Sequence, residues 1–200
     1  SVNCRNTSSR LIVSALRLHR GLRVHSGIIT QEYQQLAESG ALDAAAEHVS
    51  GIAWGDAAFR SWLPQSGFVF RSVVKTHGHD ELAAIPGFVS IGSALEVDLA
   101  GNLNLEWRAG RRVSSVGGAP DYLRAAAASA GGRAIIALQA ASGSGGSRIV
   151  PSLKAPSISG ELADIVVTEH GVASIKGLSG DDRAKAMIAI AAPEHRAFLE

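Results

Sequence analysis

Two adjacent glycines, Gly117 and Gly118, stand directly before a run of residues that predicts an Ala-rich helix. Glycine lets main-chain N–H groups approach a ligand closely, and a helix start adds unpaired donors and the positive end of the helix dipole. Such a turn can bind a phosphate, a carboxylate or a developing oxyanion. It is equally consistent with a tight connection between a strand and a helix, so the residues alone leave both interpretations open.

Two carboxylates, Glu96 and Asp98, alternate with apolar residues in a short stretch of the chain. Paired carboxylates can serve as general acid and base. Charged residues on one face of a strand are more often simply exposed to solvent. We therefore expect Glu96 and Asp98 to lie on a solvated strand face.

Two further clusters are weaker candidates. His77, His79 and Asp80 lie close together, but a metal site there needs ligands from elsewhere in the chain, and we expect no metal. The Gly/Ser-rich segment 142–147 lacks the lysine and the spacing of a phosphate-binding P-loop, so a mobile linker is the favoured interpretation.

The composition excludes several classes of protein. Of 200 residues, 46% are hydrophobic and 18% charged, which is typical of a globular chain. The net charge of +1 offers no bulk attraction for nucleic acid or for an anionic membrane. The single cysteine, Cys4, excludes an internal disulfide and a Cys-rich zinc site. Because no apolar stretch is long enough to span a bilayer and no secretory signal is evident, we expect a cytoplasmic location.

Apolar spacing and turn residues predict helices alternating with strands. Helices are expected at residues 11–16, 30–37 and 57–63, between Asp121 and Gly131, and from a capping box at Ser179 and Asp182 to a stop at Pro193. Strands are expected at residues 22–25, 68–74, 133–138 and 165–168.

A β-hairpin is predicted where the alternation of residues 95–99 continues through residues 103–107 across Gly101 and Asn102. Together these elements predict an α/β fold with a mostly parallel sheet flanked by helices. Residues 1–9 are expected to be an irregular extension, and residues 10–200 a single domain.

Several runs of residues resemble the acetyl-CoA hydrolase/CoA-transferase family in their order and spacing. They are Leu22–Gly27, Ile91–Leu99, Ser115–Gly118, Ser147–Pro151, Val167–Ala173 and the segment from Asp182 to Arg196. The resemblance covers residues 10–200 and implies the second of the two similar α/β domains of that family. It implies coenzyme A as a substrate and an N-terminal CoA-transferase domain, or a second copy of the chain, as the partner.

The resemblance also implies a mechanism. In this family a glutamate attacks an acyl-CoA thioester, and CoA then passes to a second, small carboxylic acid or is released to water. That glutamate normally follows a His-Thr/Ser pair. Here His25 and Ser26 are followed by Gly27, which has no side chain to act as a nucleophile.

Other positions also depart from the family pattern. The glycines of the family's CoA loop are absent near residues 4–9, and Gly92 replaces the usual Asn. The position of a lysine that contacts CoA in some family members falls near Gly143. The positions that keep the pattern imply CoA binding by Leu95, Ser114, Gly117 and Gly118.

Two functions are therefore expected. The first is an acyl-CoA hydrolase or CoA-transferase homologue acting on a small acyl-CoA such as acetyl-CoA, with Glu96, or more distantly Glu32, as the catalytic carboxylate. The alternative is a non-catalytic CoA-binding or assembly domain that has lost the nucleophilic glutamate.

Overall fold

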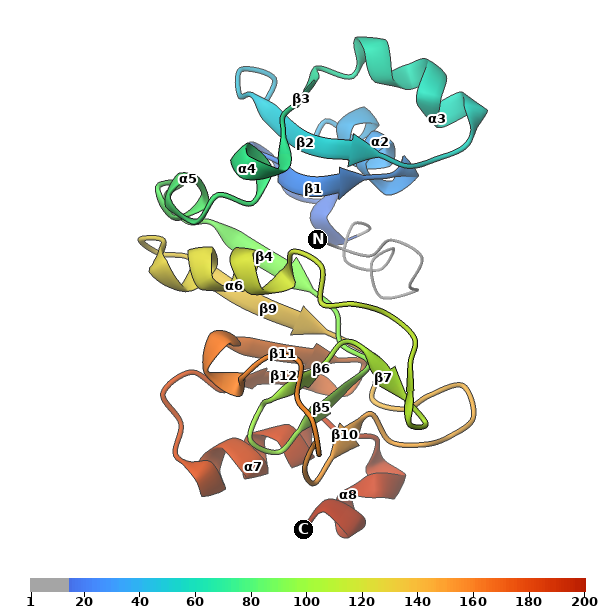
Figure 1. Cartoon of the computed structure of the whole chain (residues 1–200), viewed down its shortest axis with the longest axis vertical. Helices are drawn as coiled ribbons and strands as arrows, with labels where there is room; N and C mark the ends of the chain where they lie inside the picture. Colours follow the sequence, from blue (N-terminus) through green and yellow to red (C-terminus); the bar gives the residue numbers. More distant parts are fainter. Residues whose placement is uncertain (1–14) are drawn as a thin grey trace. The chain divides into compact units, whose positions relative to one another are not determined.

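The computed structural model describes residues 15–200 (Figure 1), and the chain divides into two compact units, the first ending at Glu81 and the second beginning at Leu82. The predicted boundary between residues 9 and 10 and most of the predicted helix 11–16 lie outside the described residues. The single domain expected for residues 10–200 thus contains two compact units. The α/β prediction itself is confirmed, because each unit combines parallel strands with helices.

The first unit is built on a three-stranded parallel sheet in the order β1-β2-β3. Its strands are β1 (His25–Ile29), β2 (His48–Ala53) and β3 (Phe68–Phe70), and its helices are α2 (Gln31–Glu38), α3 (Ala57–Trp62), the 3-10 turn η1 (Leu63–Gln65) and α4 (Val73–Thr76). Helix α5 (His79–Ala83) crosses the boundary between the units. A small core forms where Ile29, Phe59 and Phe68 pack with the half-buried Trp62.

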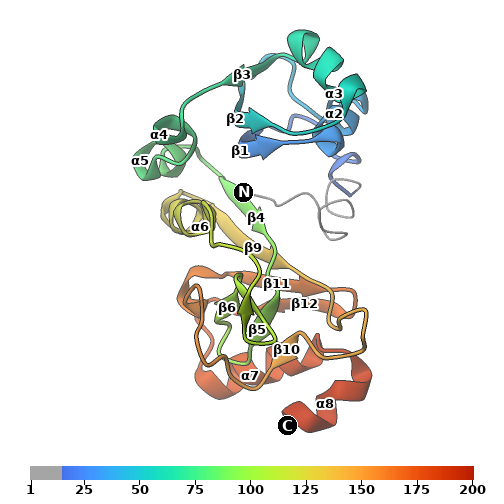
Figure 2. The same ribbon diagram turned by 45° about the vertical axis from the view of Figure 1, so that its right-hand side comes forward.

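The second unit contains a four-stranded sheet in the order β12-β11-β9-β4. Strands β4 (Val89–Gly92), β9 (Arg133–Ala137) and β11 (Ile165–Thr168) are parallel, and β12 (Gly171–Ser174) is antiparallel to β11. Helix α6 (Ala119–Ala128) packs on β4 and β9, and α7 (Gly180–Ala189) packs on β12 (Figure 2). Helix α8 (Pro193–Leu199) and the 3-10 turn η2 (Gly160–Leu162) complete the helices.

A second, three-stranded sheet has the order β10-β5-β6. It contains β10 (Ile149–Val150), β5 (Glu96–Asp98) and β6 (Leu103–Asn104). In the chain, β6 is followed by a hairpin of β7 (Trp107–Arg108) and β8 (Arg111–Arg112). Val97 and Leu103 are fully buried in the same core as Ile136, Val166 and Met187. The two sheets of this unit therefore share one hydrophobic core.

The predicted β-hairpin is confirmed at its centre, where Glu96 pairs with Asn104 and Val97 with Leu103. Its predicted extension to Trp107 is wrong, because Trp107 pairs with Arg112. The Asn104 side chain accepts hydrogen bonds from the main-chain N–H groups of Glu106 and Trp107, which turns the chain away from β5.

Three other predicted boundaries are corrected by the structure. The strand predicted at residues 22–25 begins only at His25 and runs to Ile29. The strand predicted at residues 68–74 ends at Phe70, and the exposed Val73 opens α4. Pro193 begins α8 and does not end α7, since the first turn of a helix needs no N–H donor from proline.

Two predicted helix caps have different outcomes. The Ser179 hydroxyl accepts a hydrogen bond from the main-chain N–H of Asp182, as the capping box requires. Thr30 occupies the N-cap position of α2, but its hydroxyl donates to Glu32 and does not cap the helix.

Substitution of Gly160 by alanine tests the close contact between η2 and the turn that joins β5 to β6. A Cβ atom at this position would lie 2.5 Å from the Ala100 carbonyl oxygen and 2.6 Å from the Gly101 carbonyl carbon. Since main chain cannot move as easily as a flexible side chain, we expect Gly160→Ala to lower the free energy of unfolding by about 1–3 kcal/mol.

The matched control is Gly180→Ala at the start of α7, where nothing lies within 4 Å of the added Cβ. We expect this variant to unfold at or slightly above the urea midpoint of the unchanged protein. Equal midpoints for the two variants would contradict the prediction.

Candidate functional site

The turn between β8 and α6 contains both predicted glycines. Gly117 has a φ of +53°, a conformation that favours glycine, and Gly118 is the N-cap of α6. Ser114 and Gly117 are exposed, and Gly118 is partly exposed. The turn therefore presents its main chain to solvent.

The N–H donors of this turn are only partly used by the helix itself. The N–H of Ala119 bonds to the Val116 carbonyl and that of Asp121 to the Gly118 carbonyl, while Pro120 has no N–H. The N–H groups of Gly117 and Gly118 have no acceptor in residues 15–200. Two N–H donors next to a helix N-terminus are thus left without an acceptor, an arrangement that suits an anion.

Glu96 in β5 is fixed by the side chain of Asn104 in β6. Asn104 is buried, and its Nδ2 donates to Glu96 Oε2 at 2.7 Å and to the Trp107 carbonyl at 2.7 Å. Glu96 is half-buried, and its second oxygen, Oε1, has no hydrogen-bond partner in the described part of the chain. One carboxylate oxygen is therefore held while the other remains available.

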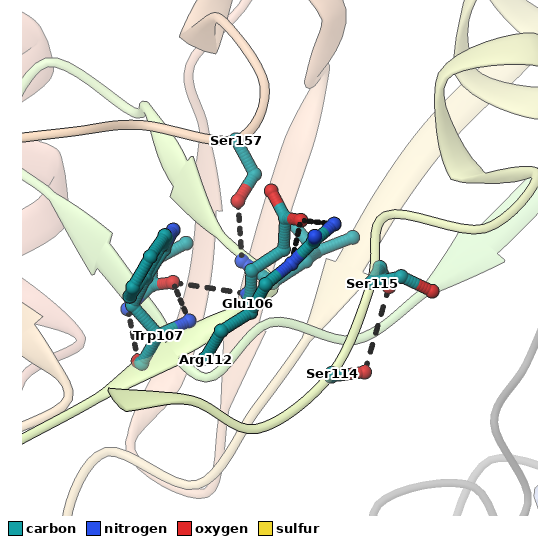
Figure 3. Close-up of polar contacts among 8 residues, drawn as sticks. Glu106, Trp107, Arg112, Ser114, Ser115 and Ser157 are labelled. Atoms are coloured by element: carbon teal, nitrogen blue, oxygen red, sulfur yellow. Dashed lines mark hydrogen bonds and ion pairs between the residues drawn. The ribbon is translucent and has the colours of Figure 1, made fainter. Parts of the chain in front are cut away.

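Hydrogen bonds connect Glu96 to the turn that contains Ser114. Asn104 Oδ1 accepts from the Glu106 N–H at 3.1 Å, and the Glu106 carbonyl accepts from the N–H groups of Val113 at 2.7 Å and Ser114 at 3.3 Å. The Glu106 carboxylate in turn accepts from Nε and Nη2 of Arg112 at 3.0 and 2.6 Å (Figure 3). The structure thus links Glu96 and Ser114 through two residues, Asn104 and Glu106, that the sequence analysis did not single out.

Other predicted contacts at this site are less specific. Leu95 is half-buried and donates its main-chain N–H to the Asn104 carbonyl at 2.8 Å. The Ser114 hydroxyl makes only a long contact of 3.5 Å with the Ser115 carbonyl (Figure 3). The sequence signal that could have revealed Asn104 is an asparagine inside the predicted hairpin, because an asparagine side chain commonly bonds to the main chain that follows it.

Asp98 does not lie on a solvated strand face, contrary to expectation. Only 3% of its surface is exposed, and its carboxylate accepts from Asn102 N, Asn102 Nδ2 and Leu153 N at 2.9, 3.0 and 3.1 Å. These bonds hold two loops together. Because all three donors need this acceptor, Asp98 has a structural role and is not a partner of Glu96 in acid–base chemistry.

Glu32 belongs to the first unit, whereas Glu96 belongs to the second. It lies in the first turn of α2, is 8% exposed, and accepts a hydrogen bond from the Thr30 hydroxyl at 2.5 Å. A carboxylate held in this way is less available to a substrate than the partly exposed Glu96.

Gly27 lies inside β1 and is buried. It is not among the glycines with positive φ, so its backbone conformation is one that other residues adopt. The space around the neighbouring strand is tight, since a Cβ on Gly51 would lie 2.8 Å from the Gly27 carbonyl oxygen and 3.3 Å from Thr76 Oγ1. Position 27 therefore borders a closely packed contact between β1, β2 and α4.

His25 precedes Gly27 by two residues in β1. Burial lowers the pKa of its imidazole below the usual 6.5, although the Lys75 main chain and the carboxylates of Glu81 and Glu47 act to raise it. Its Nε2 atom is buried and has no hydrogen-bond partner among residues 15–200. The neutral form is consequently favoured in the folded protein.

The described residues contain neither a metal-ligand cluster nor a membrane-spanning helix. Residues 15–200 contain no cluster of three or more His, Cys, Asp or Glu side chains that could hold a metal ion, including around His77 and His79. None of the helices in that range is both long enough and apolar enough to cross a membrane.

Comparison with known proteins shows the class to which this fold and site belong. Residues 55–200 match the acetyl-CoA hydrolase/transferase C-terminal domain, and the chain belongs to this family. This confirms the family resemblance drawn from the sequence.

Three similar proteins illustrate the relationship. The chain is 29% identical over 88% of its length to a butyryl-CoA:acetate CoA-transferase of Anaerostipes caccae, covering 43% of that protein. It is 44% identical over 56% of its length to a 4-hydroxybutyrate coenzyme A transferase of Clostridium kluyveri, covering 27% of that protein. The crystal structure of RipA from Yersinia pestis superposes with a TM-score of 0.87 and 29% identity, over 95% of this chain and 45% of RipA. The chain thus spans less than half the length of each of these proteins.

The half-buried His25 predicts a pH dependence of stability. Because its pKa is lower in the folded than in the unfolded protein, the unfolded chain binds a proton more readily as the pH falls below 6.5. Its contribution to stability is present above 6.5 and is lost as the pH falls through the folded pKa. We expect the urea midpoint to decrease between about pH 7.5 and about pH 5.

Substitution identifies the group responsible for this decrease. His25→Gln should flatten the decrease, while His79→Gln, at an exposed position, should leave it unchanged. A wild-type slope in His25→Gln would show that another group controls the pH dependence.

Proposed function

We propose that this chain supplies the CoA-binding C-terminal part of an acyl-CoA hydrolase or CoA-transferase that acts on a small acyl-CoA such as acetyl-CoA. The observation that carries the proposal is the turn at Gly117 and Gly118, whose two open N–H groups lie at a helix N-terminus. Family membership adds the expectation that the ligand is a CoA thioester. The two relatives are named as CoA-transferases of butyryl-CoA and acetate and of 4-hydroxybutyrate. These names favour a short acyl group and a small carboxylate acceptor, or water in a hydrolase.

Each residue of the site has a proposed role. Gly117 and Gly118 donate to the developing oxyanion of the thioester or to CoA itself. Leu95 and Ser114 contact CoA. Glu96 is the first candidate for the catalytic carboxylate because Oε1 is available and Oε2 is oriented by Asn104. Glu32 is the second candidate.

The reaction assigned to Glu96 is nucleophilic attack on the thioester carbonyl. Its carboxylate oxygen forms a bond to the acyl carbon, and the carbon–sulfur bond breaks to release CoA as a thiolate. The acyl–glutamyl anhydride then reacts with the thiolate, which frees the carboxylic acid and leaves a glutamyl-CoA thioester. An acceptor carboxylate or water completes the turnover.

A non-catalytic CoA-binding or assembly domain is the second candidate function. The observation that favours it is Gly27, which offers no side chain at the position implied for the family's nucleophile and which borders a tightly packed contact. In this case the chain would bind CoA or complete an assembly with an N-terminal CoA-transferase domain or a second copy of itself. We place either function in the cytoplasm.

Removal of one main-chain donor tests the binding role of the glycine turn. Gly118 has a φ of −82°, which proline can approach, so Gly118→Pro deletes the N–H while keeping φ at this position near its present value. We expect CoA affinity measured by calorimetry to fall about 10-fold, as for the loss of one charge-assisted hydrogen bond.

The control is Gly118→Ala, which adds a side chain but keeps the N–H donor. Its CoA affinity should remain within about 3-fold of the unchanged protein, because its donor is intact. If alanine weakens binding as much as proline does, the effect is steric and the donor role is wrong.

A covalent intermediate distinguishes the two candidate functions. The chain is incubated with acetyl-CoA, reduced with borohydride and analysed by intact-protein mass spectrometry followed by peptide mapping. We expect a modified glutamate at position 96 that is absent from Glu96→Gln and retained in Glu32→Gln, since Glu96 has an available, oriented carboxylate oxygen whereas Glu32 is buried and bonded to Thr30.

Each alternative result has a definite meaning. A modified residue at Glu32 would reverse the order of the two carboxylates. Absence of any adduct in a chain that still binds CoA would favour the non-catalytic domain. The variant Gly27→Glu is then the change to examine, with its stability measured before its activity, and we expect a small gain in exchange activity at best.

A further inference from the structure

The hairpin of β7 and β8 carries an unusual arrangement of charge. Its register places Trp107 opposite Arg112 and Arg108 opposite Arg111. Ala109 and Gly110 form the two-residue turn, with φ values of +48° and +73°, as in the type I′ turns that favour short hairpins. Since directly opposite residues of an antiparallel pair share a face, Arg108 and Arg111 project from the same side of the hairpin.

Only one of the three arginines in this hairpin is neutralised. Arg112 donates twice to the Glu106 carboxylate. Arg108 and Arg111 are exposed, and their guanidinium groups have no hydrogen bond or ion pair with any residue in the range 15–200. Like charges directly opposite each other destabilise a strand pair. The hairpin therefore keeps two uncompensated guanidinium groups side by side at a cost in stability.

This arginine pair is connected to the glycine turn by main chain that is held in place. β8 continues without interruption into Val113 and Ser114, and both N–H groups bond to the carbonyl of Glu106, just before β7. Arg112 is tied to the side chain of the same residue (Figure 3). The base of the hairpin and the start of the turn at Ser114 are thus anchored on Glu106.

We propose that Arg108 and Arg111 bind the phosphate groups of the CoA part of the substrate, an inference that rests on the proposed function. The planar guanidinium group presents paired donors that match phosphate oxygens, and two such groups on one face can share a diphosphate or a phosphomonoester. CoA carries both, at the end of the molecule remote from its thioester. The ligand's charge also removes the repulsion between the two arginines. The glycine turn and the hairpin would then recognise different parts of one ligand.

The test measures binding of CoA, dephospho-CoA and pantetheine to the 200-residue chain by calorimetry. The variants are Arg108→Gln and Arg111→Gln, singly and together, with Arg124→Gln as the control. Arg124 is an exposed arginine of α6 without a hydrogen bond or ion pair in the described chain, so this variant makes the same change in charge.

We expect each single hairpin variant to weaken CoA binding about 5- to 10-fold, and the Arg124 control to change it less than about 2-fold. The loss should be smaller for dephospho-CoA and absent for pantetheine, which has no diphosphate. Added salt should weaken CoA binding to the unchanged chain more than to the double variant. Without ligand, the hairpin variants should be at least as stable as the unchanged protein, which separates a binding defect from misfolding.

The outcomes separate this inference from the proposed function. If the unchanged chain binds CoA and the double variant binds it equally well, the arginine pair has no role and the proposed function stands. If CoA and pantetheine bind with the same affinity, phosphate recognition is also excluded. If the unchanged chain binds no CoA at millimolar concentration, both the proposed CoA site and this inference are wrong.

Discussion

The side chain of Asn104 makes four hydrogen bonds, and the candidate site of the second unit depends on them. Its amide donates to Glu96 and to the Trp107 carbonyl, and its oxygen accepts from the N–H groups of Glu106 and Trp107. A buried amide must satisfy both its donors and its acceptor. Asparagine meets these demands together, whereas aspartate would repel Glu96 and leucine would leave every partner unpaired. The start of the β7–β8 hairpin and the orientation of Glu96 thus follow from one residue.

The carboxylates of the protein differ in what they leave open to a ligand. Asp98 accepts three hydrogen bonds that join two loops, Glu106 is paired with Arg112, and Glu32 is bonded to Thr30. Glu96 and Glu106 each retain an unbonded oxygen within the described residues, because Arg112 bonds only to Oε1 of Glu106, but only the Glu96 carboxylate is also held by the buried Asn104. The groups that the site offers to a ligand are therefore the Glu96 carboxylate and the N–H donors of Gly117 and Gly118. All three lie on one continuous stretch of chain, from Glu96 to Gly118.

Much of the fold could be predicted because its signals are local. The alternation around Gly101 and Asn102 predicts the pairing of β5 with β6, and Ser179 and Asp182 predict the start of α7. The errors occur where local preference was overruled. Val73 and Val74 favour a strand by residue type but lie exposed in the short helix α4, where nothing on a neighbouring strand pairs with them.

For the site, the sequence by itself predicted a tight turn at Gly117 and Gly118, because glycine permits the positive φ that Gly117 adopts and the first N–H groups of a helix have no partner within the helix. It also determined that the position after His25 and Ser26 has no nucleophile. Only the tertiary structure decided which carboxylates are available. Glu96 and Asp98 are indistinguishable in the pattern of β5, yet one is buried against the N–H of Leu153, more than fifty residues later, and the other keeps a free oxygen. The partners that make this difference come from distant parts of the chain, and no spacing within a strand can specify them.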